Sequence, residues 1–144
     1  MSELSVAVLD RVNDRVVEDV NRLIPQLGKD TAGCDAAHLE RVIGNASNVV
    51  LAARLGPRVV GLLTLVVVVL PTGVTSRLED VVVDREHRGR GIGLALVQEA
   101  LREAKRRGAQ EVDLTSRPSR VAAHRLYEKV GFVRRETDVF RYAL

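Results

Sequence analysis

The residues best suited to chemistry lie in one short turn of glycines and arginines. Glycine occupies positions 89, 91 and 93, Arg88 precedes the first glycine, and Arg90 separates the first from the second. Because glycine has no Cβ, it lets backbone N–H groups come close to a ligand. The first N–H groups of a following helix have no partner inside that helix, and the helix dipole adds positive potential. This pattern predicts a binding site for phosphate oxygens over residues 88–94.

Two familiar phosphate loops do not account for this turn. A Walker loop needs Gly-Lys-Ser or Gly-Lys-Thr, and neither occurs in the sequence. The dinucleotide fingerprint G-x-G-x-x-G fails as well, since its last position falls on Leu94 or Leu96. Glycines before a helix also occur in turns that bind nothing, so the glycines alone leave both interpretations open.

A strand and a helix must position this turn. Residues 74–83 read as a strand that ends in the apolar run Val81, Val82 and Val83. Residues 90–107 read as an amphipathic helix, with charged residues on one face and Gly108 after its last turn. The next strand is expected at 111–115, a second helix at 119–130 with Ser119 as its cap, and a closing strand pair at 133 and 139–143.

The first half of the chain predicts one strand, two helices and a hairpin. We expect a strand at 5–9, helices at 14–27 and 35–44, and strands at 48–55 and 58–70. Pro25 weakens the end of the first helix. The element order is then β-α-α-β-β-β-α-β-α-β-β. The prediction is an α/β fold with a mixed, mostly antiparallel central sheet and flanking helices, in a single domain over residues 1–144.

Composition bounds the function classes. The chain has 144 residues, of which 46% are hydrophobic and 28% charged, and this balance is typical of a folded globular protein. Its longest apolar run, residues 59–70, is too short for a membrane helix of ~20 residues, so we read it as a strand buried on both faces. Residues 1–10 lack the basic start of a secretory signal, which favours the cytoplasm. Cys34 is the one cysteine, so neither an intrachain disulfide nor a thiolate metal cluster is expected.

Two motifs together resemble the GNAT superfamily of acyl-CoA-dependent N-acetyltransferases. The segment Arg88-Gly89-Arg90-Gly91-Ile92-Gly93 matches the family signature Q/R-x-x-G-x-G/A. The segment Leu126-Tyr127-Glu128-Lys129-Val130-Gly131-Phe132 is similar to the family pattern L-Y-E-K-x-G-F. The element order fits too, so the resemblance covers nearly the whole chain. It implies acetyl transfer from acetyl-CoA to a primary amine by direct attack, without a metal, on a sheet whose strands splay at the cofactor site.

The resemblance also implies roles for individual residues. Backbone N–H groups of residues 88–94, which include Ile92 and Leu94, would hold the pyrophosphate of coenzyme A. The strand end at Val81, Val82 and Val83 would pair with the pantetheine arm. Tyr127 would protonate the leaving thiolate. Arg120 stands where many relatives have an asparagine that contacts the cofactor arm, so either that contact is lost or Arg120 reaches a cofactor phosphate.

The general base is left open between two carboxylates. An alkylammonium must lose a proton before it attacks, and Glu79 and Asp80 stand just upstream of the valines. Adjacent strand residues point to opposite faces, so at most one of the two is expected to face the acetyl group. A salt bridge to an arginine is the competing interpretation. His124, three residues before Tyr127, is either a neighbour that tunes the tyrosine or an exposed histidine; His87 and His38 have no visible partner.

Two other functions fit parts of the sequence. A coenzyme A fold without turnover would act as a non-catalytic acyl-CoA-binding module, although the presence of Tyr127 argues against it. The net charge of +3 would also suit a basic nucleic-acid-binding domain, but the aromatic content is only 3% and acidic residues are interspersed with the arginines. The acceptor cannot be named from residues 1–60. A homodimer is expected because the valine-rich hairpin would benefit from a cover.

Overall fold

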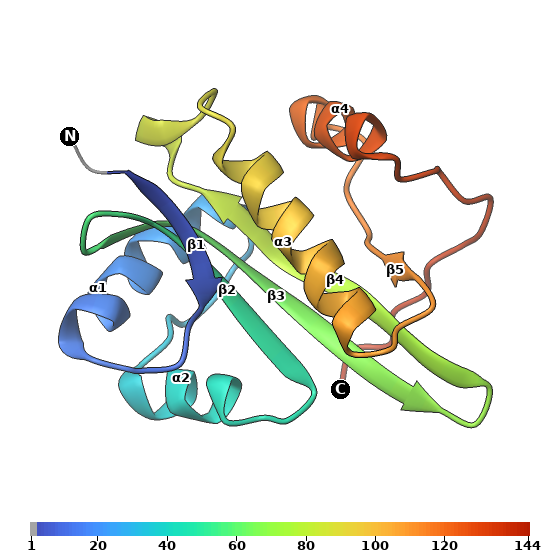
Figure 1. Ribbon diagram of the computed structural model, residues 1–144, viewed down its shortest axis with the longest axis horizontal. Helices are drawn as coiled ribbons and strands as arrows, with labels where there is room; N and C mark the ends of the chain where they lie inside the picture. The colour runs from blue at the N-terminus through green and yellow to red at the C-terminus, as the bar shows by residue number, and fades with distance from the viewer. Residues whose placement is uncertain (1–2) are drawn as a thin grey trace.

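Five strands form one sheet in the order β1-β2-β3-β4-β5 in the computed structural model, which describes residues 3–144 (Figure 1). The strands are β1 (Leu4–Val8), β2 (Asn48–Leu55), β3 (Arg58–Leu70), β4 (Gly73–Val83) and β5 (Val112–Asp113). The first three pairings are antiparallel and β4 with β5 is parallel. This confirms the predicted fold class. Met1 and Ser2, which begin the stretch read above as lacking a secretory signal, lie outside the described residues.

Helices cover both faces of the sheet. They are α1 (Asp14–Leu23), the 3-10 turn η1 (Ile24–Leu27), α2 (Ala36–Ile43), the 3-10 turn η2 (Arg85–His87), α3 (Ile92–Arg106) and α4 (Val121–Val130). The Asn13 side chain caps α1 by accepting a hydrogen bond from the Val16 N–H. The predicted helix 14–27 is shorter than expected because Pro25 converts its last turn to η1.

The core has two parts, one on each face of the sheet. Along β2, Val49, Leu51 and Ala53 pack toward α3, whereas Val50 and Ala52 pack toward α1 and α2. Successive side chains of a strand point to opposite faces, so β2 contributes to both parts at once. The prediction of a strand buried on both faces holds for the first part of β3, where residues 59–63 are all buried.

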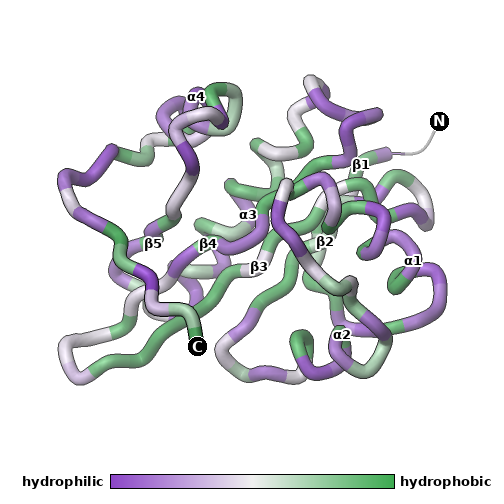
Figure 2. Tube along the Cα trace, turned by 180° about the vertical axis from the view of Figure 1, so that it is seen from behind, coloured by the Kyte–Doolittle hydropathy of each residue, from purple (hydrophilic) through white to green (hydrophobic). Residues whose placement is uncertain are grey.

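The far end of the β3–β4 hairpin projects beyond the helices (Figure 1). Its tube is largely hydrophobic in colour (Figure 2), and Val69 and Leu70 are exposed. Over residues 3–144, no helix combines the length and hydrophobicity that crossing a membrane requires.

The C-terminal part differs from the prediction in three ways. The strand expected at 111–115 is limited to β5, and the closing strand pair at 133 and 139–143 is not formed. Because β5 has only two paired residues, its outer edge offers almost no template for a further strand. Ser119 does not cap α4; Arg120 takes the cap position without a side-chain hydrogen bond.

Candidate functional site

The glycine turn opens directly into the N-terminus of α3. Gly91 is the cap residue of α3 and adopts a left-handed conformation with φ 79°. No side chain caps the helix, and the Gly91 carbonyl accepts the first helical bond from the Ala95 N–H. The N–H groups of the first turn therefore point out of the helix toward any ligand that lies on the turn. This is the geometry of an anion site at a helix N-terminus.

The three glycines of the turn have different surroundings. Gly89 (φ 78°) and Gly91 both have positive φ, and a Cβ added at either would meet no atom within 4 Å. Their backbone faces open space, as an approaching ligand requires. A Cβ on Gly93 would instead lie 3.1 Å from Leu126 Cδ2. Gly93 thus allows α3 to pack closely on α4, which the sequence argument did not predict.

The arginines of the turn are exposed and partly engaged within the chain. Arg88 Nε donates to the Val83 carbonyl over 3.1 Å. Arg90 Nη1 lies 3.4 Å from His87 Nδ1. Both side chains remain close to the turn and add positive charge there. Ile92 is buried in the core and Leu94 is half-buried, so these two can offer a ligand only their backbone N–H groups.

Strands β4 and β5 separate beside this turn. They pair only at Ser76 with Val112 and at Arg77 with Asp113, although β4 continues to Val83. Val83 opposes Gly61 on β3, and the Asp84 N–H donates to the Val60 carbonyl. Val83 is therefore in a non-hydrogen-bonded pair, and its own N–H and C=O point away from β3, into the opening between β4 and β5.

A β-bulge interrupts β4 at the predicted carboxylates. Leu62 pairs with Val82 but Thr64 pairs with Glu79, so Asp80 and Val81 together oppose one residue of β3. Asp80 has φ 53°, and it is the one non-glycine with positive φ among residues 3–144. The bulge breaks the alternation of side chains on which the sequence argument relied.

Glu79 and Asp80 both line the same cavity. That at most one of them faces the acetyl group stays a prediction. This cavity has a volume of about 940 Å³. We call it the β4 cavity. Its walls come from η1 and the following loop, the end of β4, the chain after β5, α4 and the C-terminal segment. Its lining includes Val81, Tyr127 and Arg120 together with Glu79 and Asp80.

Each carboxylate of the bulge has a cationic partner. Glu79 Oε1 pairs with Arg77 Nε, and Asp80 Oδ1 pairs with Lys29 Nζ. These pairs are half-exposed. The ion-pair interpretation left open for Glu79 is thus present in the structure.

Tyr127 is buried on α4, with 9% of its surface exposed, and its ring packs edge-on against Phe132 with 5.8 Å between ring centroids. Burial raises the pKa of the Tyr127 phenol, and the positive charge of Arg120 offsets part of this rise. Because its pKa is raised, the phenol keeps its proton at neutral pH and can donate it. Tyr127 also lines the β4 cavity.

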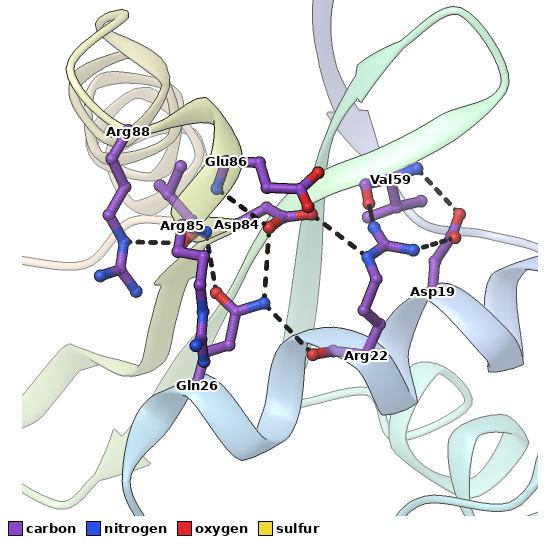
Figure 3. A network of polar contacts seen from close by, with 9 residues as sticks. Asp19, Arg22, Gln26, Val59, Asp84, Arg85, Glu86 and Arg88 are labelled. Carbon is purple, nitrogen blue, oxygen red and sulfur yellow. Dashed lines mark hydrogen bonds and ion pairs between the residues drawn. The ribbon is translucent and has the colours of Figure 1, made fainter.

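A buried ion network ties α1 to the start of the glycine turn (Figure 3). Arg22 Nε donates to Asp84 Oδ2 over 3.2 Å, and Arg22 Nη1 donates to Asp19 Oδ1 over 2.6 Å. Arg22 Nη2 donates to the Val59 carbonyl, and Asp19 Oδ2 accepts from the Val59 N–H. Both carboxylates are buried, at 5% and 2% exposure for Asp19 and Asp84.

Asp84 and Gln26 fix the backbone that leads into the turn. Asp84 Oδ1 accepts from the Glu86 N–H over 3.3 Å, and Gln26 Oε1 accepts from the Arg85 N–H over 2.8 Å (Figure 3). Burial by itself would raise the pKa of Asp84, but the hydrogen bonds from Glu86, Arg22 and Gln26 lower it below its usual value. Asp84 is therefore held as a carboxylate.

Asp84, Glu86 and His87 form one group of potential metal ligands in the described part of the chain, with ligand atoms within 4.8 Å of one another. The oxygens of Asp84 already accept hydrogen bonds from Arg22 and the Glu86 N–H. The group is explained by this network without an ion.

Several residues of this region were missed by sequence reasoning. Asp19 and Gln26 lie far from both motifs in the chain, and Arg117 belongs to neither. Asp19 and Arg22 are three residues apart on α1, but that spacing does not predict their contacts with Val59 and Asp84. Asp84 offered one signal, since an aspartate directly after a buried strand often caps the next turn.

His124 lies on α4 with its Nδ1 3.5 Å from Arg134 Nη2, and the structure gives it no hydrogen bond to Tyr127. Cys34 is buried, and burial raises the pKa of its thiol.

The amino-acid sequence is similar to those of known acetyltransferases. Residues 20–132 match the acetyltransferase (GNAT) family. N-alpha-acetyltransferase 30 of Schizosaccharomyces pombe is 41% identical over 69 residues, which cover 42% of this chain and 46% of that protein. The chain thus spans less than half of this curated relative.

Solved structures share the whole fold. An aminoglycoside acetyltransferase from an uncultured soil metagenomic sample superimposes with a TM-score of 0.86 at 22% identity, over 98% of this chain and 96% of that one. A Trypanosoma brucei acetyltransferase does so with a TM-score of 0.77 at 26% identity, over 99% and 100%. The matched family and the shared fold identify this chain as a member of the GNAT family of acetyltransferases, and so as an acyltransferase enzyme.

Proposed function

We propose that the enzyme transfers an acetyl group from acetyl-CoA to a primary amine by direct attack. The observation that carries the proposal is the opening between β4 and β5, which begins beside the uncapped N-terminus of α3. A long thioester with a pyrophosphate at one end fits this arrangement. Its anionic end would bind the turn, and its arm would lie along β4.

The residues present fit this co-substrate. The backbone of residues 88–94 would hold the pyrophosphate, since Gly89 and Gly91 leave open space above it. Val81, Val82 and Val83 would line the arm, with the Val83 N–H and C=O directed into the opening. Arg120, half-buried at the start of α4 and on the wall of the β4 cavity, would add positive charge beside the arm.

Acetyl-CoA, when bound, supplies a thioester with an electrophilic carbonyl carbon. The acceptor nitrogen forms a bond to that carbon as the carbon–sulfur bond breaks. Tyr127 gives its phenolic proton to the departing sulfur, a role that a buried and protonated tyrosine can perform. A backbone N–H at the Val82–Val83 end of β4, that of Val83, would polarise the carbonyl.

The ammonium proton of the acceptor must go to a base. Glu79 and Asp80 both line the β4 cavity and are the candidates, directly or through a water. Each of them forms an ion pair, Glu79 with Arg77 and Asp80 with Lys29.

Calorimetry with acetyl-CoA and with ADP, followed by a thiol-release assay with simple amines, tests this function. Acetyl-CoA should bind more tightly than ADP, because it contacts both the turn and β4. Equal affinity for acetyl-CoA and ADP would contradict the proposed site for the arm. No binding of acetyl-CoA would contradict the proposed function.

The arrangement of charges supports an enzyme over a nucleic-acid-binding domain. On α3, Arg102, Arg106 and Arg107 pair with Glu99 and Glu103, so this helix presents no unbroken basic stripe. We also propose one catalytic domain over residues 1–144, because the strands from Leu4 to Asp113 all belong to one sheet. A homodimer is proposed on the exposed apolar end of the β3–β4 hairpin and is tested by sedimentation. The cytoplasmic location stays a prediction.

A further inference from the structure

The charged lining of the β4 cavity is unbalanced. Five cationic side chains face three carboxylates: Lys29, Arg77, Arg117, Arg120 and Arg141 against Asp30, Glu79 and Asp80, which leaves a formal net charge of +2. Two of the cations are neutralised in the pairs Arg77–Glu79 and Lys29–Asp80. The excess therefore resides on three arginines, those at positions 117, 120 and 141.

These three arginines have no anionic partner in the described part of the chain. Within residues 3–144, none of their guanidinium groups lies within 4.0 Å of a carboxylate oxygen. They come from separate elements, namely the loop after β5, the start of α4 and the C-terminal segment. Arg117, Arg120 and Arg141 thus bring positive charge to one cavity, and a bound anion would compensate their mutual repulsion.

Arg117 is held in place for such an anion. Its Nη2 donates to the Leu27 carbonyl over 3.2 Å. Gly28, which ends η1 with φ 72°, leaves the room for this contact, since a Cβ there would lie 3.2 Å from the same nitrogen. The remaining donors of the guanidinium fork can still bind a phosphate or carboxylate.

The pyrophosphate of the co-substrate does not need these arginines. Its proposed site is the turn at residues 88–94, and none of those residues lines the β4 cavity. The chain therefore has two separate cationic features, and the second lies on the side where Glu79, Asp80 and Tyr127 would meet the acceptor.

We propose that the acceptor is a small amine that also carries an anionic group, a phosphate or a carboxylate, bound by Arg117 and Arg141. This inference rests on the proposed acetyl transfer and names its substrate class. The amine end lies toward the carboxylates of the bulge and the anionic end toward the arginines. The same charges disfavour polycationic amines such as spermidine, which would meet an excess of like charge.

Matched pairs of amines test the proposal in a thiol-release assay with acetyl-CoA. Glucosamine 6-phosphate against glucosamine tests phosphate, and β-alanine against β-alaninamide tests carboxylate. In at least one pair the anionic amine should have a kcat/KM about tenfold higher or more, as expected for a charge-assisted hydrogen bond. For slow probes, the same ratio is read as Kd by calorimetry on the CoA-saturated protein.

Variants then assign the preference to the arginines. Arg117→Gln and Arg141→Gln should each reduce it by about tenfold, with the KM of acetyl-CoA unchanged. Arg125→Gln is the matched control, because Arg125 is an exposed arginine on α4 outside the cavity. Equal use of both members in both pairs overturns the proposal. So does a rise in the KM of acetyl-CoA, which would assign the arginines to a co-substrate phosphate. Failure of acetyl-CoA itself to bind is a different result and counts against the proposed function.

Discussion

Arg22 on α1 and Asp84 at the end of β4 are 62 residues apart in the chain, yet Arg22 Nε donates to Asp84 Oδ2 over 3.2 Å. Arg22 is also the partner of Asp19, so one guanidinium compensates two buried carboxylates. Through Asp84 the same guanidinium reaches the backbone of η2, which leads into the glycine turn. A side chain on α1 thereby supports the backbone that leads into the proposed pyrophosphate site.

Replacing Arg22 should be costly. Arg22→Ala leaves Asp19 and Asp84 buried without a cation, and we expect a loss of about 2 kcal/mol or more in the free energy of unfolding, measured in urea. Arg102→Ala, which breaks an exposed pair on α3, should cost about 1 kcal/mol or less. Similar losses for the two variants would mean that the network contributes little. The Kd of acetyl-CoA should rise for Arg22→Ala only.

The contribution of Asp84 should depend on pH in one direction. Its pKa in the folded protein is lowered, so the stability that it adds is fully present above the ordinary carboxyl pKa of about 3.9 and is lost as the pH falls through the lower folded value. The difference in free energy of unfolding between wild type and Asp84→Asn should be constant from about pH 5 to 8 and shrink below about pH 4. A difference that grew toward acid would contradict the assignment.

Tyr127→Phe should separate chemistry from folding. Phenylalanine keeps the edge-on contact with Phe132 but has no proton to give. We expect kcat to fall by about 10²-fold or more, with the Kd of acetyl-CoA and the melting temperature nearly unchanged. Unchanged kcat with weaker acetyl-CoA binding would make the tyrosine a structural residue. Since burial raises the pKa of Tyr127, no loss of kcat from its ionisation should be seen below about pH 10.

The glycines of the turn should respond differently to alanine. Gly91→Ala places a side chain at φ 79° on the ligand-facing side, so it should weaken acetyl-CoA binding by about tenfold and cost about 1 kcal/mol of stability. Gly93→Ala should mainly lower stability, because its Cβ meets Leu126. In a Leu126→Ala background that contact is absent. Adding Gly93→Ala there should cause no further loss in the free energy of unfolding. Calorimetry and urea unfolding of these variants check both expectations.

Glu79→Gln and Asp80→Asn, made separately, test the base. The sequence argument predicts one severe and one mild loss of kcat, and the shared cavity leaves both side chains as candidates. Asparagine tolerates the positive φ of Asp80, so the fold should be retained. Two mild losses would indicate a base carried by water or by the acceptor.

The sequence predicted the fold where local signals agree. The helix around α3 and the hairpin of β3 and β4 carry strong periodicity and turn residues, and both formed as expected. The glycine turn was located from residue types alone. Gly91 can adopt a positive φ and has no side chain to cap the helix. The different role of Gly93 could not be read, because it depends on Leu126 from another helix.

Long-range features were beyond the sequence. The bulge at Asp80 depends on the register between β3 and β4, so the rule of alternating side chains does not hold in this part of β4. The partners of Arg22 and Arg117 lie on distant elements and leave no local pattern. The closing strands were predicted from valine and aromatic content, but strand propensity has no effect where β5 offers so short an edge.

The two-residue pairing of β4 with β5 also has a mechanical consequence. The unit of β5 and α4 is joined to the rest of the sheet by very few backbone hydrogen bonds, so it should open and exchange its amide hydrogens at a lower free energy than β2 and β3. A ligand that contacted both β4 and the unit of β5 and α4 would stabilise the folded state against this local opening. The melting temperature of the enzyme would then report its occupancy, and a thermal-shift screen could find ligands before any reaction is observed.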